Sequence, residues 1–201
     1  MSEFERQNER MTTGAAEMSH ATLDEEAMLV RRCLGGDQGA FDRLYARYRE
    51  KVYVLAMGIL MDAEDAADAV QDTFSLAYRN LGRFKQQSRF GTWLFRIAVN
   101  ASIQLSRKRK NRALSSELDD SIAVPAPQED EQTIDAALVS AAMAKLKPDD
   151  RAVLTLFYWE DLPLEQIGES LGCAANAAKT RLYRARERFR AELVKLQKEH
   201  A

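Results

Sequence analysis

The stretch LEQIGESLGCAANAAKTRLYRARERFR, residues 164–190, decides the fold, because it reads as two helices joined by a tight turn. The first helix is short and amphipathic and ends at Gly172, a residue type that often follows the last turn of a helix. The second has apolar side chains along one side and basic side chains along the other. This layout is typical of a helix-turn-helix, whose second helix lies in the major groove of DNA. An ordinary helical hairpin with a basic outer face has the same spacing, so the spacing alone leaves both interpretations open.

The rest of the chain also predicts helices. From residue 24 to 105 and from 134 to 196, apolar residues recur at three- and four-residue steps, and no strand signal is longer than a few residues. Asp37 and Asp62 stand where they can cap the starts of helices, and Pro148 suits a first helical position. The low content of 9 Gly and 4 Pro argues against a turn-rich β-sandwich.

We therefore expect an all-α protein of two small helical domains joined by a flexible acidic linker, with the helix-turn-helix in the C-terminal domain. Between the two domains the helical period is lost, and Pro125, Pro127 and a cluster of acids give a composition typical of linkers. The expected segments are a disordered N-terminal tail over 1–22, a first domain over 23–111, the linker over 112–132 and a second domain over 133–201.

Charge is segregated along the chain, although the net charge is only -2. Ten basic residues and no acid lie between Arg79 and Arg112, and eight basic residues with three acids lie between Ala177 and Ala201. The stretch from Ala113 to Asp135 has seven acids and no base. Ordinary solvated faces mix both signs, so two basic blocks of this purity predict two surfaces for a polyanion.

The sequence offers no set of residues for catalysis. His20 and His200 lie near the ends of the chain, and with Cys33 and Cys173 they form no catalytic set, no zinc set and no disulfide framework. There is no glycine-rich phosphate loop, no secretory signal and no apolar run long enough to span a bilayer. We expect a cytoplasmic protein that is not an enzyme, with no catalytic residue, no cofactor and no metal site.

The first basic block is interleaved with aromatic residues. Phe84 and Phe90 flank a polar loop, which predicts open rings, and Trp93 also fits the apolar stripe of a helix. Aromatic rings stack on unpaired bases while basic side chains follow the backbone, so the block is suited to single-stranded nucleic acid. The preceding helix has an acidic outer face, which repels DNA. That face suits either solvent or a basic protein partner.

These motifs resemble those of a known family. In chain order they are AEDAADAVQDTF (63–74), Phe84, FGTWLFRIAVN (90–100), LKPDDR (146–151), LG (171–172) and KTRLYRA (179–185). The first three resemble region two of bacterial sigma factors, and the others resemble region four. Two regions in this order, on a short acidic linker, make the chain similar to the extracytoplasmic-function (ECF) group of the sigma-70 family.

The resemblance implies a factor that binds bacterial core RNA polymerase, directs it to specific promoters and promotes DNA melting without covalent chemistry. It implies promoter DNA as partner, both duplex and single-stranded, and an anti-sigma factor, with no direct membrane insertion. It also implies a place at the nucleoid when the protein is bound to polymerase. A stand-alone helix-turn-helix regulator of duplex DNA is the alternative, but it leaves the aromatic-basic block and the acidic face unexplained. A helical adaptor without a nucleic-acid role does not explain the purely basic block.

The resemblance also assigns residues to three surfaces. An acidic face for core polymerase consists of Asp65, Asp68, Gln71 and Asp72. The residues for the minus-ten element are Lys85, Gln86, Gln87, Ser88, Arg89, Phe90, Trp93, Arg96 and Asn100. Those for the minus-thirty-five element are Lys179, Thr180, Arg181, Tyr183, Arg184 and Arg188.

The start of the recognition helix departs from the family pattern. Relatives favour a Ser or Thr cap and a branched apolar pair, whereas this chain has Ala174, Ala177 and Ala178 there, with Cys173 before them. Asn176 is the remaining candidate cap, which would shift the start of the helix toward the C-terminus.

Overall fold

The structure is a computed structural model that describes residues 25–115 and 131–199. Within these ranges every regular element is a helix, and the described residues include no strand. The all-α fold class is therefore confirmed. The expected N-terminal tail and most of the expected linker lie outside the described residues.

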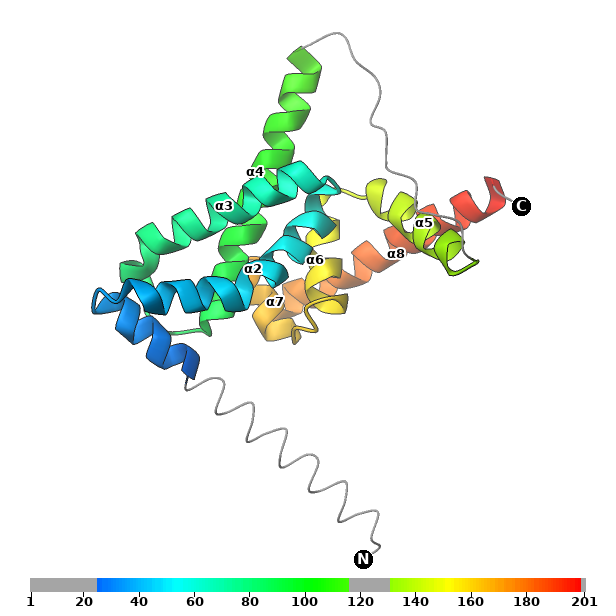
Figure 1. Cartoon of the computed structure of the whole chain (residues 1–201). Helices are drawn as coiled ribbons and strands as arrows, with labels where there is room; N and C mark the ends of the chain where they lie inside the picture. Colours follow the sequence, from blue (N-terminus) through cyan, green and yellow to red (C-terminus); the bar gives the residue numbers. More distant parts are fainter. Residues whose placement is uncertain (1–24, 116–130, 200–201) are drawn as a thin grey trace, which may run out of the picture.

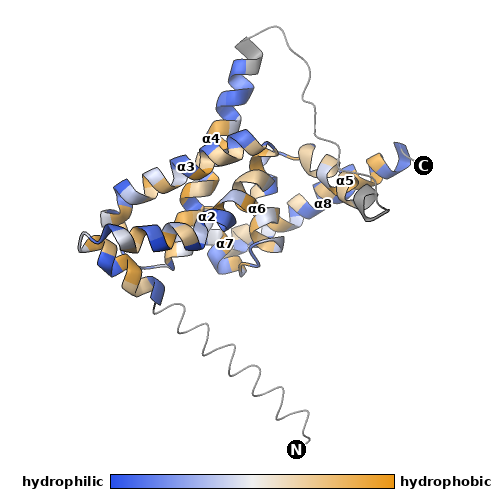
Figure 2. Ribbon diagram, in the orientation of Figure 1, coloured by the Kyte–Doolittle hydropathy of each residue, from blue (hydrophilic) through white to orange (hydrophobic). Residues whose placement is uncertain are grey.

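The first half of the chain forms a helical unit around an apolar core. Its elements are a helix over 25–34, α2 (Gln38–Leu60), α3 (Ala63–Asn80), the short 3-10 helix η1 (Leu81–Arg83) and α4 (Phe90–Ser115). Buried side chains such as Leu44, Leu55, Phe74 and Leu94 fill the space between α2, α3 and α4. Figure 2 shows hydrophobic residues turned toward the neighbouring helices and hydrophilic ones toward the outside.

Two of these helices begin at caps that the sequence predicted. The side chain of Asp37 accepts a hydrogen bond from the backbone N–H of Ala40 at 3.2 Å. Asp62 accepts from the N–H groups of Glu64 and Asp65, each at 3.0 Å. Both caps are confirmed, and both satisfy first-turn N–H groups that have no partner within the helix.

The second half begins with α5 (Glu131–Ala144) and α6 (Pro148–Tyr158) and ends with the helix-turn-helix of α7 (Leu164–Ser170) and α8 (Ala175–Glu199). Pro148 occupies the start of α6, as predicted. The prediction that Asn176 caps the last helix is wrong, because the helix already starts at Ala175. The N–H groups of Ala177 and Ala178 donate to the carbonyl of Ala174, and Asn176 lies inside the first turn.

The two halves pack directly against each other, which the sequence did not predict. Helix α2 contacts α6, and α4 contacts α7 (Figure 1). Leu156 and Ile167 of the second half belong to the same buried core as Leu55 and Leu94 of the first. The helices approach closely at Gly58, where a Cβ atom would lie 2.4 Å from the hydroxyl oxygen of Thr155.

Helix α4 extends beyond the rest of the bundle (Figure 1). It continues to Ser115, past residue 112, where the linker was expected to begin. The exposed basic residues between Arg107 and Arg112 lie on this extension. None of the helices in the described ranges is long and apolar enough to cross a membrane.

Candidate polymerase and DNA interfaces

The acidic face of α3 is mostly open to solvent. Asp68, Gln71 and Asp72 are exposed, and they lie within two helical turns on one side of the helix. Asp65 is different, because it is half-buried and forms an ion pair with Arg109 of α4 at 2.8 Å. Three of the four predicted residues therefore form a continuous acidic and polar surface, and the fourth joins α3 to α4.

The sequence did not predict that Arg109 of α4 contacts the start of α3. Its guanidinium also donates to Asp62 at 3.0 Å, so one arginine holds two carboxylates at the start of α3. Hydrogen bonds from the backbone N–H of Asp65 and from Arg109 hold the pKa of Asp62 below its usual value. Hydrogen bonds to Asp65 and Asp62 raise the pKa of Arg109.

Beside the acidic face lies a hollow of about 520 Å³ with aromatic walls. The hollow is lined by Phe41, Tyr45, Phe74 and Tyr78, and also by Gln71 of the acidic face. Tyr45 is 40% exposed and Tyr78 is 54% exposed. The rings meet edge to face, with centroids 4.7 Å apart for Tyr45 and Phe74 and 5.0 Å apart for Phe41 and Tyr78.

The polar loop, residues 85–89, connects η1 to α4 and lies at the surface. Lys85, Gln86, Gln87 and Arg89 are exposed, and Ser88 is half-buried. The backbone of Gln86 has a φ of 54°, a left-handed conformation that is uncommon for residues other than glycine.

The aromatic residues around the loop are less open than predicted. Phe84 is 8% exposed and Phe90 only 2%, so the prediction that they flank the loop as open rings is wrong. Their rings form a cluster with Trp93, whose centroid lies 5.0 Å from Phe84 and 5.7 Å from Phe90. The reason is a tertiary contact, since Phe90 starts α4 with its ring centroid 5.6 Å from that of Tyr48 of α2. Phe90 therefore supports the loop from beneath and offers no free stacking face.

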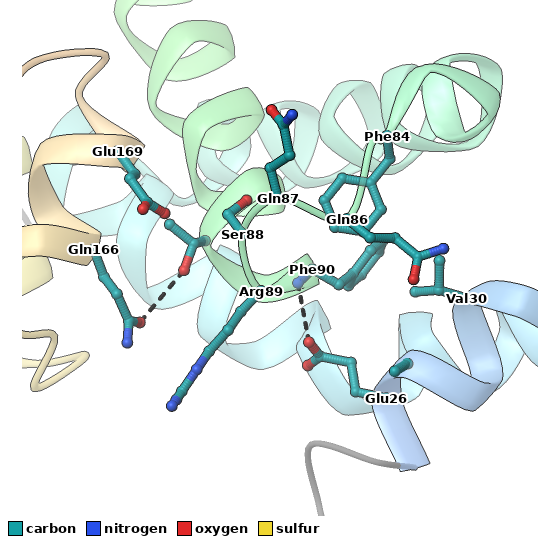
Figure 3. Close-up of a pocket in the computed structure, with 12 residues that line it drawn as sticks. Glu26, Val30, Phe84, Gln86, Gln87, Ser88, Arg89, Phe90, Gln166 and Glu169 are labelled. Atoms are coloured by element: carbon teal, nitrogen blue, oxygen red, sulfur yellow. Dashed lines mark hydrogen bonds between the residues drawn. The ribbon is translucent and has the colours of Figure 1, made fainter.

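The loop forms one wall of a polar cavity of about 450 Å³ (Figure 3). Gln86, Gln87, Ser88 and Arg89 line it from the loop side, and Glu26 lines it from the helix over 25–34. The opposite wall is α7, which contributes the polar side chains of Gln166 and Glu169. The two halves of the chain thus share this cavity.

Hydrogen bonds tie α7 to the start of α4. The hydroxyl of Thr92 donates to the side-chain oxygen of Gln166 at 3.3 Å, and Ser170 donates to the carbonyl of Thr92 at 3.4 Å. A second hollow, lined by Trp93, Arg96 and Glu169 among others, continues along the same boundary.

Further along α4, the structure brings three predicted residues together. Trp93, Arg96 and Asn100 line one hollow of about 390 Å³ on the side of the helix that faces η1 and the end of α3. Trp93 is half-buried, while Arg96 and Asn100 are exposed. Their spacing of three and four residues puts them on one helical face.

Helix α8 presents a basic face that we define as Lys179, Thr180, Arg181, Tyr183 and Arg184. All five side chains are exposed, and Tyr183 is 65% exposed. The other side of α8 is anchored by Ala178, Leu182 and Ala185, which are buried. The predicted residues therefore lie together on the free side of the second helix of the helix-turn-helix.

Arg188 has a different environment from the basic face. Its guanidinium donates to both carboxylate oxygens of Asp150, at 2.6 and 2.8 Å. Asp150 belongs to the first turn of α6 and is buried, so this pair holds α8 against α6. Nearby, Arg186 lies over the rings of Phe157 and Tyr158, 4.7 and 5.3 Å from their centroids.

Two protein-family models match the chain over most of these surfaces. Residues 44–112 match Sigma-70 region 2, and residues 136–189 match Sigma-70, region 4. The chain belongs to the sigma-70 family. The first match contains the acidic face and the polar loop, and the second contains the helix-turn-helix, so the predicted order of the two regions is confirmed.

Relatives place this sigma factor in the ECF group. The RNA polymerase sigma-H factor of Pseudomonas aeruginosa is 31% identical over 178 residues, which cover 83% of this chain and 92% of the relative. The ECF RNA polymerase sigma factor SigW of Bacillus subtilis is 32% identical over 176 residues, 82% of this chain and 94% of the relative. The predicted identity, a sigma factor that acts in transcription initiation, is confirmed.

Solved structures agree with the fold. CnrH, in complex with the cytosolic domain of CnrY, is 25% identical and superimposes with a TM-score of 0.64 over 88% of this chain and 99% of that chain. The sigma factor RpoE from Bartonella quintana, in complex with the anti-sigma factor NepR, is 27% identical, with a TM-score of 0.63 over 77% of this chain and 96% of that chain.

Proposed function

We propose that this sigma factor divides promoter recognition among three surfaces. The acidic face of α3 binds core RNA polymerase, the polar loop and the following turns of α4 take up the unpaired minus-ten element, and the basic face of α8 reads the minus-thirty-five element. The observation that carries this proposal is the polar cavity of about 450 Å³ at the polar loop. The amide and hydroxyl groups that line the cavity can bond the edges of a base that has left the stack.

The acidic face suits a protein partner and not DNA. Asp68 and Asp72 are exposed one helical turn apart, and the carboxylates would repel a phosphate backbone. The aromatic hollow beside Gln71 offers apolar area next to the charges. Charges that set orientation, next to aromatic residues that bury area, are a common composition for protein interfaces.

The minus-ten surface divides into contact and support. The exposed residues of the polar loop, with Trp93, Arg96 and Asn100, can reach a single strand. Phe90 lies behind them in the core, and its burial supports a structural role. Melting then needs no covalent chemistry, because each base captured in a pocket offsets part of its unstacking cost of a few kcal/mol.

For the minus-thirty-five surface, the side chains at the start of α8 are the ones that can reach base edges in the major groove. Lys179 and Arg184 are the donors we assign to bases. Arg188 is engaged with Asp150, and this pair supports a role in orienting α8 on α6. We therefore propose Arg188 as a positioning residue for this surface.

The wider setting follows from the same assignment. We propose a tail over 1–22, a first domain that begins at residue 23 and continues along α4 to Ser115, an acidic linker from there to residue 132 and a second domain over 133–201. The factor would act in the cytoplasm at the nucleoid, and it would not be an enzyme. The complex of RpoE with the anti-sigma factor NepR supports an anti-sigma factor as a partner of this chain.

The loop assignment is tested by separating DNA binding from DNA opening. Gln86, Gln87 and Ser88 are replaced together with Ala, and the variant is bound to core polymerase on a linear promoter. We expect closed-complex binding near that of the wild type and reduced permanganate reactivity of unpaired thymines. A promoter with a pre-melted bubble presents its bases already unstacked and should restore part of the signal. Loss of duplex binding together with normal opening would show that the loop does not act on single-stranded DNA.

A further inference from the structure

Helix α4 starts without a cap of its own. The N–H of Trp93 donates to the carbonyl of Arg89 at 3.1 Å, which places Arg89 at the position that precedes the first turn. At the same position α2 and α3 have Asp37 and Asp62, whose carboxylates accept first-turn N–H groups. The side chain of Arg89 has only donors. The N–H of Phe90, a residue 2% exposed, therefore needs an acceptor from elsewhere in the chain.

Glu26 supplies that acceptor from the helix over 25–34. One of its carboxylate oxygens accepts the N–H of Phe90 at 3.0 Å, across 64 residues of sequence (Figure 3). The other oxygen accepts the hydroxyl of Tyr48. Glu26 is only 7% exposed, so both bonds are shielded from water. A buried carboxylate is stable in a protein when donors satisfy it, and the N-terminus of a helix favours its negative charge.

The contacts around Glu26 leave little freedom at the start of α4. Burial, together with the hydrogen bond to Glu26, raises the pKa of Tyr48, so its hydroxyl remains a donor at physiological pH. A Cβ atom on Gly91 would lie 2.8 Å from the Tyr48 hydroxyl oxygen, which shows how closely α4 approaches α2. The first turn of α4 is thus held by Glu26 through a hydrogen bond and by Tyr48 through contact.

We propose that Glu26 is a positioning residue for promoter melting: it fixes Phe90 and thereby the polar loop directly before it. The loop has no regular structure of its own, so its end point at Phe90 sets where its side chains stand over the cavity. This inference rests on the proposed function of the loop. Glu26 acts through the backbone of α4 and needs no contact with DNA.

Amide hydrogen exchange of the free full-length protein tests the positioning step. Glu26→Ala removes both hydrogen bonds, and Phe90 with the adjacent loop should exchange about tenfold faster or more, the factor expected for losing one hydrogen bond to a charged group. Glu26→Gln retains an acceptor for Phe90 and a polar partner for Tyr48, so it should keep most of the protection. The matched control is Glu25→Ala, which removes the neighbouring exposed carboxylate that pairs with Arg47.

A second variant covers the case in which Glu26→Ala does not fold. Tyr48→Phe keeps the ring and leaves the bond from Phe90 to Glu26 in place, but it removes one of the two donors to the carboxylate. Exchange at Phe90 should then rise above that of the wild type, and by less than in Glu26→Ala where that variant folds. Unchanged exchange in Glu26→Ala, unchanged exchange in Tyr48→Phe where Glu26→Ala does not fold, or equally fast exchange in Glu26→Gln and Glu26→Ala would overturn the positioning role.

The promoter assay separates this inference from the function on which it rests. With core polymerase, Glu26→Ala should reduce permanganate reactivity on a linear promoter while closed-complex binding stays near wild type, and Glu26→Gln should restore opening. Faster exchange with normal opening would contradict the assignment of the polar loop to single-stranded DNA and leave the positioning of α4 standing. Slow exchange with defective opening would mean that Glu26 acts by another route, and the inference would be wrong.

Discussion

The side chain of Asp62 has two structural roles in this sigma factor. It caps α3, and it forms an ion pair with Arg109 of α4. Asp62→Ala should lower the free energy of unfolding by about 1 kcal/mol, the usual cost of losing such a cap. Asp62→Asn retains a cap acceptor and should cost less. Urea unfolding followed by circular dichroism measures both, and equal losses in the two variants would show that the charge and not the cap matters.

The same residue predicts a pH dependence. The folded pKa of Asp62 is lower than its ordinary value of 3.8, mainly because of the hydrogen bond from the Asp65 backbone N–H. The ionised carboxylate therefore stabilises the fold above that ordinary value, and the contribution is lost as the pH falls through the folded pKa. Between neutral pH and the acid range, wild type should lose more stability than Asp62→Asn in the same urea titration. Parallel curves would contradict this.

Lys179 and Arg184 are the residues of the basic face with the sharpest expected phenotype. Replacing either with Ala should relax base preference in the minus-thirty-five element, because a good base contact is worth about 1–3 kcal/mol of discrimination. Arg190, exposed further along α8, is the matched control. Arg190→Ala should weaken binding to all sequences about equally, as expected for a phosphate contact. Closed-complex titrations of the holoenzyme on single-base promoter variants distinguish the two patterns, and identical profiles would remove the base-reading role.

At the scale of one element, the two sides of α3 have different roles: one side packs in the core and the other carries the acidic face. Ala66, Ala69, Phe74 and Ala77 are buried against the bundle, whereas the acidic face points to solvent. Reversing charge with Asp68→Lys and Asp72→Lys should therefore weaken binding to core polymerase severalfold or more while the helix content and thermal midpoint stay near wild type.

The control for this experiment is a charge reversal elsewhere on the same unit. Asp42 and Glu50 are exposed acids of α2, and Asp42→Lys with Glu50→Lys changes the net charge by the same amount. Fluorescence titration with labelled core polymerase should separate the two double variants. Equal affinities for both would reduce the acidic face of α3 to a solvated surface.

The elements also show which features a sequence can predict. Caps such as Asp37 and Asp62, and the proline at the start of α6, depend on neighbours within a few residues, and each was predicted correctly. The cap of α4 was missed, because Glu26 lies 64 residues from Phe90 and no local pattern connects them. The burial of Phe90 was missed for the same reason, since a polar loop precedes it in sequence while Tyr48 covers it in space.

At the scale of the whole molecule, periodicity could predict two helical units and not their contact. The residues at the contact, such as Leu156 and Ile167, also belong to the buried core. The sequence therefore contains no additional apolar stripe that would predict the contact. The same limit applies to Arg188, which reads as one more base on a basic helix until its pairing with Asp150 is seen.

The packing of the two halves has a consequence for DNA. Glu169 of α7 lines the same cavity as the polar loop, so an acidic side chain occupies a wall of the space assigned to a captured base (Figure 3). In this arrangement α7 occupies part of the cavity that a single strand would enter. We therefore expect the free protein to bind single-stranded minus-ten DNA weakly, and to bind it more tightly once α7 moves away.

Gly58 provides a way to move the halves apart. A Cβ atom there would lie 2.4 Å from the hydroxyl oxygen of Thr155 and 2.9 Å from its methyl carbon, so rotating the threonine cannot relieve both clashes. Gly58→Ala should enlarge the radius of gyration in small-angle scattering and keep the helix content, since alanine itself favours α2. The control is Gly39→Ala in the same helix, where the nearest neighbour lies at an ordinary 3.4 Å.

A compensating substitution makes the prediction specific to this contact. Thr155→Ala removes both clashing atoms, so the double variant Gly58→Ala with Thr155→Ala should regain the compact form. Anisotropy with a labelled single-stranded minus-ten oligonucleotide should follow the scattering, with affinity raised in Gly58→Ala and lowered again in the double variant. If Gly58→Ala expands without binding the strand better, α7 does not block the loop. Tight and specific binding of the free wild type to duplex promoter at physiological salt would show that the packed arrangement does not restrain DNA binding. The protein would then recognise promoters without polymerase.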